Sequence, residues 1–259
     1  MPAPEEAVKR FEDWSMMLSP PFAMYADIEA ILEKPAEEGR VLQTHVPCAV
    51  GSYLVAHKGL NRHQYPVVVN EGRTCVQDFC MELDTLVHEI YDYNQKNCRK
   101  PQSRTPETEA IFEAATQCEY CKAVFSDAVK KVWHHDHISG DFVAALCQRC
   151  NTRIRQPMAT LPVYFHNLRN YDMHAMCIDG FSKMKDWILK PIAQTKEKYI
   201  TLTVKKVVGH DEGGKAIYFY IRFVDSFQFL TASLDKLSSG LPRDKMKHAQ
   251  LSVHGSLVK

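Results

Sequence analysis

Two C-x-x-C pairs constrain the fold of this chain more than any other feature of its sequence. Cys118 and Cys121 form the first pair, Cys147 and Cys150 form the second, and 25 residues, 122 to 146, separate them. Four thiolates can form the closed tetrahedral shell of structural zinc, with unliganded core cysteines as the alternative. A module this short has little core to bury, so the bound metal would supply its folding free energy.

The composition indicates a globular protein that is neither secreted nor membrane-bound. The chain has 259 residues, 45% of them hydrophobic and 24% charged, which is enough for one large domain or two smaller ones. Its start lacks the apolar run of a signal peptide, and no span of about 18 apolar residues occurs, so we expect no membrane partner and a nuclear or cytoplasmic location. In a reducing compartment the nine cysteines favour metal ligation over a disulfide framework.

The charge balance gives no global signal for a nucleic-acid partner. Lys and Arg number 32 against 31 Asp and Glu, a net charge of +1. Basic side chains nevertheless cluster locally, at 96–104, 149–155 and 243–247. A locally basic groove on a neutral protein can still bind DNA, so this class of partner stays open.

An acidic pair ends the first apolar run. Asp27 and Glu29 stand two residues apart in the segment 22–30, which predicts a buried strand. Because side chains alternate along a strand, both carboxylates would point to the same side. Two acids on one face repel unless a cation neutralises them, and Mg²⁺ takes oxygen ligands of this kind. The pair therefore indicates half of a two-metal site, with a solvated strand end as the simpler alternative.

The order of apolar runs predicts an α/β scaffold interrupted by a small inserted module. Spacings of three and four residues predict an amphipathic helix at 76–94. A polar linker at 94–108 would lead into a module at 109–156, so the scaffold would consist of 1–108 and 157–259. Strands are expected at 22–30, 41–57, 161–165, 199–208 and 216–224, the last two joined by a glycine-bearing hairpin turn.

The segment between the cysteine pairs carries a nuclease-like pattern. It contains Val-Trp-His-His-Asp-His-Ile-Ser-Gly at 132–140, and Asn151 directly follows the last cysteine. With the cysteines, this pattern resembles the ββα-metal, or HNH, nucleases, particularly the phage recombination endonuclease VII group. The resemblance implies that His134 and Asn151 bind a catalytic divalent ion and that His135 is the general base. A neutral imidazole can activate water near pH 7 while an ion stabilises charge on the phosphate.

The module also departs from that group. His134 stands where the endonuclease VII group has aspartate, which removes one anionic oxygen ligand. The segment 141–143, Asp-Phe-Val, replaces a basic stretch that would meet DNA. Two interpretations therefore stay open: an HNH endonuclease that cleaves branched or duplex DNA, and a zinc-stabilised DNA-binding or structural module.

A second acidic motif follows the module. The strand expected at 161–165 leads to Asn167, Tyr171 and Asp172. Asp-x-Glu together with Asn-x-x-x-Tyr-Asp resembles the first two motifs of the 3′ to 5′ proofreading exonuclease of family B DNA polymerases. Over roughly residues 20–241 the order of parts resembles the amino-terminal half of protein-primed polymerases encoded by Maverick/Polinton-type transposons. Further segments that carry this resemblance are 196–200, 223–230 and 233–237.

The second resemblance implies a fold and a chemistry. The fold would be an RNase H-like (DnaQ-type) exonuclease domain in which Asp27, Glu29 and Asp172 hold two Mg²⁺ or Mn²⁺ ions across a scissile phosphate. Asn167 would help position the terminal nucleotide of a single-stranded DNA end. Taken alone, Asp172 would instead be an acid that complements a helix macrodipole. Asp225 would lie on a structural strand, so we assign it no metal.

One part of the exonuclease pattern is missing. No Tyr-x-x-x-Asp motif follows Leu241, and no polymerase palm motif occurs, so the chain would not synthesise DNA by itself. The resemblance implies a polymerase domain or other replication proteins as partners. Three functions stay open: an exonuclease-type domain with weak hydrolysis, an HNH endonuclease, and a catalytically inactive zinc-containing adaptor for nucleic acid.

Overall fold

The computed structural model describes residues 18–34, 43–57, 66–97, 104–154, 156–169, 172–193 and 199–242. They belong to two compact units. The sheet unit comprises Phe22–Val55, His63–Ile90 and Ala159–Lys259, and the cysteine unit comprises Met1–Pro21, Ala56–Arg62 and Tyr91–Met158. The expected mixed α/β class is confirmed.

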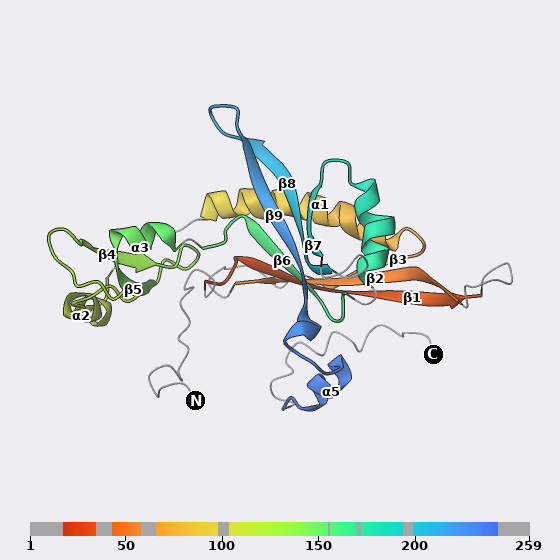
Figure 1. Ribbon diagram of the computed structural model, residues 1–259, viewed down its shortest axis with the longest axis horizontal. Helices are drawn as coiled ribbons and strands as arrows, with labels where there is room; N and C mark the ends of the chain where they lie inside the picture. The colour runs from red at the N-terminus through yellow and green to blue at the C-terminus, as the bar shows by residue number, and fades with distance from the viewer. Residues whose placement is uncertain are drawn as a thin grey trace. The chain divides into compact units, whose positions relative to one another are not determined.

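A seven-stranded sheet forms the sheet unit (Figure 1). Its strand order is β3-β2-β1-β6-β9-β8-β7. The central pairs β1–β6 and β6–β9 are parallel, whereas β2–β3, β7–β8 and β8–β9 are antiparallel. The strands are β1 (Phe22–Glu33), β2 (Thr44–Ala56), β3 (Val68–Glu71), β6 (Thr160–Phe165), β7 (Ile188–Ala193), β8 (Tyr199–His210) and β9 (Ala216–Asp225).

The hairpin between β8 and β9 follows the sequence expectation. The Asp211 carboxylate accepts hydrogen bonds from the N–H groups of Gly213 (3.0 Å) and Lys215 (2.9 Å). Gly214 has φ +77°, a left-handed conformation that glycine adopts without steric cost. Aspartate and glycine together therefore close the turn and set the register of the two strands.

Helix α1 (Cys75–Asn97) covers the sheet with an apolar stripe. Its Phe79 meets Phe165 of β6 edge to face, with ring centroids 6.3 Å apart. The stripe recurs at the three- and four-residue spacing that predicted this helix, and its buried members are Val76, Phe79, Cys80, Leu83, Val87 and Ile90. The described remainder of the unit includes α4 (Asp172–Ala175), a π-helical turn Met176–Gly180, 3₁₀ turns Phe181–Lys183 and Ser226–Gln228, and α5 (Leu234–Ser239).

A partly buried ion pair ties α1 to strand β8. The Asp84 carboxylate lies 2.8 Å from Lys206 Nζ and accepts a 2.6 Å hydrogen bond from the Trp187 indole N–H. Only about a tenth of the Lys206 side chain is exposed. Burying this ammonium is tolerable because it is paired and hydrogen-bonded, so the pair fixes α1 over the β7–β8 side of the sheet.

The cysteine unit has a ββα order. The antiparallel pair β4 (Lys131–His135) and β5 (Phe142–Cys147) is followed directly by α3 (Gln148–Arg153), and α2 (Pro106–Ala114) precedes it. The boundary that we placed between 108 and 109 falls inside α2. The polar stretch 94–108 is helical at both of its ends, so the linker prediction is wrong there.

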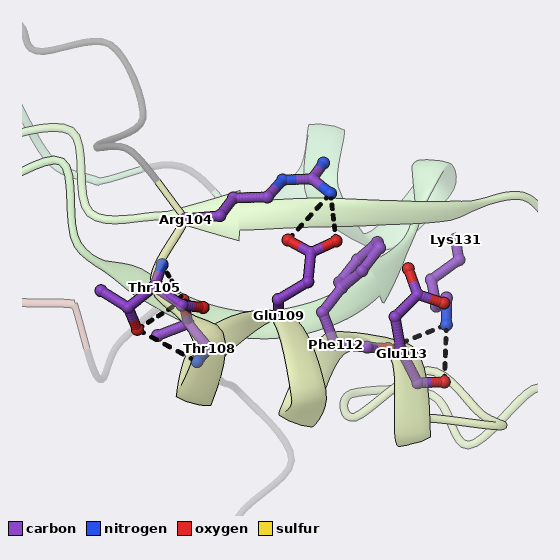
Figure 2. Close-up of polar contacts among 7 residues, drawn as sticks. All are labelled: Arg104, Thr105, Thr108, Glu109, Phe112, Glu113 and Lys131. Carbon is purple, nitrogen blue, oxygen red and sulfur yellow. Dashed lines mark hydrogen bonds and ion pairs between the residues drawn. The ribbon is translucent and has the colours of Figure 1, made fainter.

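Helix α2 is held at both ends by side chains (Figure 2). Thr105 and Thr108 form a reciprocal capping box at its start, and Pro106 occupies the first turn. At its end, Lys131 Nζ donates to the carbonyl oxygens of Phe112 (2.8 Å), Glu113 (3.2 Å) and Ala115 (3.2 Å). The Phe112 carbonyl also accepts from the N–H of Ala115 at 3.3 Å. The ammonium adds a charged donor to carbonyls of the last turn and complements the helix dipole.

No helix in the described part of the chain is long and apolar enough to cross a membrane.

Candidate metal centres

The candidate carboxylate site lies where strand β6 ends between two parallel neighbours. The register pairs Tyr25 of β1 with Tyr164, and Phe165 with Asp225 of β9. The loop that follows Phe165 therefore starts near Asp27 on one side and near Asp225 on the other. Open α/β sheets commonly bind ligands outside the carboxyl ends of parallel strands. The topology thus brings the two acidic motifs to one edge of the sheet.

Asp27 and Glu29 lie on the exposed side of β1, alternating with the buried Ala26 and Ile28. Partial shielding from water raises the pKa of the Asp27 carboxyl, and the charge of Glu29 raises it further. A hydrogen bond from the Ile28 N–H and the charge of His166 act in the opposite direction. Carboxylates that oppose each other's ionisation form a site that gains from a bound cation.

Asp172 begins helix α4 and is almost fully buried, with 4% of its surface exposed. Burial raises the pKa of its carboxyl to about 7, and the charges of Asp27, Asp225 and Glu29 raise it in that order. The three predicted acids therefore interact electrostatically, and Asp225 joins them as a fourth. A carboxylate buried among other negative charges requires a proton or a cation to neutralise it.

Asp225 is the residue whose importance sequence reasoning underestimated. It is 4% exposed, and its two oxygens accept hydrogen bonds from four donors. An aspartate followed by serine at a strand end was the only sequence signal. That signal does not reveal that β9 runs parallel to β6, which is what places Asp225 beside the second acidic motif.

His166 was also given no role from sequence. Its ring nitrogens lie 2.9 Å from Ser226 Oγ and 2.9 Å from the carbonyl oxygen of Ala232. Together with Asp27 and the stacked rings of Tyr25 and Tyr164 it lines a cavity of about 310 Å³. Nothing in the sequence distinguishes His166 from the other histidines, because its role depends on where β9 and the following turn lie.

The acids do not form a closed single-ion shell. Among the described residues, only the four cysteines gather three or more His, Cys, Asp or Glu ligand atoms within 4.8 Å of one another. Asn167, predicted to position a nucleotide, lies in the loop after β6 with φ +70°. Tyr171, the tyrosine of the second motif, lies outside the described residues.

We expect Asp172→Asn to stabilise the metal-free protein at alkaline pH. The native carboxyl has a pKa of about 7 against the ordinary 3.8, so between these pH values the native state binds more protons than the unfolded state. Stability should therefore fall as pH rises through that window. Relative to wild type, the variant should gain about 2–4 kcal/mol between pH 4 and pH 8.

Urea unfolding at pH 4, 6 and 8 in the presence of a chelator measures this gain. Asp211→Asn, in the exposed hairpin turn, is the control for an aspartate-to-asparagine change outside the site. Adding Mg²⁺ at pH 8 should stabilise wild type more than the variant, because the ion favours the ionised carboxyl. A stability difference that is the same at pH 4 and pH 8 would contradict the prediction.

The four predicted cysteine ligands form a compact cluster that could bind a metal such as zinc. The sulfur atoms of Cys118, Cys121, Cys147 and Cys150 all lie within 4.8 Å of one another. Cys121 Sγ is 3.8 Å from Cys147 Sγ, and Cys121 is the exposed member. Four thiols at this separation match the donor set of a structural tetrahedral site.

The local backbone favours ionised sulfur at one of these positions. Burial raises the pKa of Cys118, but N–H groups of Cys121, Cys147 and Tyr120 outweigh it and bring the pKa to about 7. Burial and hydrogen bonds among the thiols raise the pKa of Cys150. A cation at the centre would favour four thiolates. The buried residues Leu146 and Ile154 pack against Cys118, Cys147 and Cys150 and shield these three sulfurs from water.

The predicted HNH ligands also meet. Nδ1 of His134 lies 2.7 Å from Oδ1 of Asn151, across β4 and α3. His134 is 3% exposed, and its Nε2 has no hydrogen-bond partner in the described structure. Burial lowers the pKa of His134, which keeps the imidazole neutral as metal ligation requires. The predicted base His135 ends β4, with its ring stacked on His137 at 4.8 Å.

Sequence reasoning missed what holds the loop after β4. The Asp136 carboxylate accepts hydrogen bonds from the N–H groups of Ile138 (2.7 Å) and Ser139 (2.9 Å). Gln156 donates to the same carboxylate at 3.3 Å and accepts from the His137 N–H at 2.9 Å. An aspartate that accepts from the N–H two residues later is a common turn, so Asp136 could have been predicted from the sequence to hold this loop.

Comparison with known proteins finds no matching family model, no matching curated protein and no matching solved structure.

Proposed function

We propose that the sheet unit is an RNase H-like 3′ to 5′ exonuclease-type domain that hydrolyses single-stranded DNA ends with Mg²⁺ or Mn²⁺. The observation that carries this proposal is the buried Asp172, whose ionisation is opposed by Asp27 and Glu29 at the carboxyl end of β6. The strand order, with β1 parallel to β6 and β6 parallel to β9, supports the proposed fold.

In this proposal the acidic residues would bind the metal ions, and the aromatic residues would contact the DNA. Two divalent ions, when bound, supply water activation and stabilisation of the departing 3′ oxygen. Asp27 and Glu29 present oxygen ligands from a rigid strand, and Asp172 presents a third from the start of α4. The cavity beside Asp27, lined by Tyr25 and Tyr164, offers aromatic surface for a terminal base.

The proposed exonuclease domain also implies an evolutionary origin and a set of partners. We propose descent from a family B, protein-primed polymerase of a Maverick/Polinton-type transposon, acting in DNA replication. A polymerase domain or other replication proteins would then be its partners, in the nucleus or the cytoplasm. We also propose that the cysteine cluster binds zinc and that this zinc is structural.

The test is cleavage of linear single-stranded DNA labelled at its 5′ end, with Mg²⁺, with Mn²⁺ and with a chelator. Stepwise shortening from the 3′ end that requires the ion supports an exonuclease. Binding of DNA without any turnover in either ion would support the catalytically inactive adaptor instead.

A second candidate function is HNH endonuclease activity of the cysteine unit. The 2.7 Å approach of His134 to Asn151, on a ββα arrangement, favours it. We expect His135→Ala to abolish metal-dependent nicking of circular duplex DNA, since the general base typically contributes about 10²–10⁴-fold. His174→Ala is the matched control. An exonuclease cannot open a circle, so nicking that persists in His135→Ala would exclude this mechanism.

A further inference from the structure

The structure assigns to Asp225 the role of a positioning residue for the carboxylate site: its buried side chain holds the loop that carries Asn167 and leads into Asp172. The inference rests on the proposed function for its catalytic consequence, whereas the loop geometry stands independently. Sequence reasoning placed Asp225 on a structural strand and gave it no part in the site.

The hydrogen bonds of Asp225 reach into that loop from the end of β9. Oδ1 accepts from the N–H of Asn167 at 2.9 Å, and Oδ2 accepts from the N–H of Arg169 at 3.3 Å. The N–H of Met173 in α4 donates to the carbonyl oxygen of Leu168, between these two residues, at 2.9 Å. Asp225 therefore holds Asn167 and Arg169 on either side of the residue whose carbonyl binds the helix that begins at Asp172.

The loop turns at Asn167. This residue has φ +70°, a left-handed conformation that asparagine adopts more readily than most residues other than glycine. The hydrogen bond that the Asn167 N–H donates to Asp225 Oδ1 stabilises the chain in this conformation. Leu168, 1% exposed, anchors the next position in the core.

The same contacts argue that Asp225 acts through the loop and is not itself a metal ligand. Its oxygens also accept from the Phe227 N–H at 3.0 Å and from Gln228 Nε2 at 3.3 Å, so all four hydrogen bonds point to protein groups. A carboxylate that is 4% exposed and saturated in this way is stabilised where it lies. To bind a metal ion, Asp225 would have to give up some of these hydrogen bonds. We therefore expect it to hold the neighbouring backbone in place and not to act as a ligand.

Two substitutions separate position from charge. Asp225→Asn keeps one acceptor oxygen but turns an NH₂ group toward the Arg169 N–H, so the loop loses about half of its support. Asp225→Glu keeps both acceptors and the charge on a longer side chain, and should rescue part of the effect. Asp211→Asn is the matched control, because its carboxylate also accepts two backbone N–H groups, at the remote β8–β9 turn.

The first readout is amide hydrogen exchange of the metal-free protein followed by NMR. In Asp225→Asn the amides of Asn167 and Arg169 should exchange at least about tenfold faster than in wild type, with the β6 and β9 amides unchanged. Asp225→Glu should lie between the two, and Asp211→Asn should match wild type. Unchanged exchange at Asn167 and Arg169 in a folded Asp225→Asn protein overturns the proposal.

The second readout is Mn²⁺ affinity measured by electron paramagnetic resonance, together with kcat and KM on single-stranded DNA. We expect Asp225→Asn to weaken Mn²⁺ binding about tenfold and to lower kcat, with partial recovery in Asp225→Glu. Complete loss of Mn²⁺ binding with unchanged amide exchange would make Asp225 a ligand and refute the positioning role. If wild type neither binds Mn²⁺ nor cleaves DNA while exchange responds as expected, the proposed function fails and the role of Asp225 in holding the loop stands.

Discussion

Asp27→Ala combined with Asp172→Ala should lower metal-dependent removal of nucleotides from single-stranded 3′ ends by about 10³-fold or more. Bound metal ions contribute several kcal/mol of transition-state stabilisation to such reactions, and about 1.4 kcal/mol corresponds to tenfold in rate. Removing two of the three acids would take away most of the oxygen ligands, from β1 and from α4 at once. Initial rates with a 5′-labelled oligonucleotide in Mn²⁺ measure the loss.

The matched control replaces two exposed aspartates of the same unit, Asp186 and Asp211, with alanine. That protein should cleave at the wild-type rate, since neither residue lies among the acids that interact with Asp172. Circular dichroism of both proteins separates loss of the site from loss of the fold. Hydrolysis that survives the Asp27 and Asp172 double substitution would remove these acids from the mechanism, and with them the proposed exonuclease.

Replacing one cysteine of the cluster should unfold the cysteine unit. Zinc sites built from four protein ligands supply roughly 10 kcal/mol or more of apparent folding free energy to small domains. Its β4–β5 pair has only two strands, which are marginal without further support. We therefore expect Cys121→Ser to lose bound zinc and the dispersed amide signals of residues 118–150. Cys121 is suited to the test because it is the exposed member of the cluster, so serine adds no buried polar group.

Metal analysis and NMR spectra of the purified protein check this expectation. Wild type should contain one zinc ion per chain, and a strong chelator should reproduce the spectrum of Cys121→Ser. Cys177→Ser, a free cysteine of the sheet unit, is the control and should keep its zinc. A folded cysteine unit in a metal-free Cys121→Ser protein would show that burial alone holds it together.

The acidic site shows how much of a site a sequence can predict. Alternation along a strand placed Asp27 and Glu29 on one side of β1, and the structure has them alternating with buried Ala26 and Ile28. The environment of Asp172 was not predictable in this way. Its burial and its pKa of about 7 arise from residues on other strands, whose neighbours the sequence does not state.

The HNH segment was also only partly predictable from the sequence. The sequence predicted that His134 and Asn151 act together, and their side chains lie 2.7 Å apart. It did not predict that this contact is a hydrogen bond from a buried ring whose other nitrogen lacks a hydrogen-bond partner among the described residues. Which group each nitrogen faces depends on how α3 packs against β4.

The sequence by itself determined the local features of this protein: the C-x-x-C spacing that brings two thiols together in each pair, the amphipathic stripe of α1, the alternating strand with its two acids and the turn chemistry of Asp211 and Gly214. These depend on residues a few positions apart, where helical and extended geometry act directly. Only the tertiary structure decided that β6 lies between β1 and β9, and therefore that Asp225 supports the loop to Asp172. Strand order follows from the burial of whole faces against one another, which no short pattern of residues records.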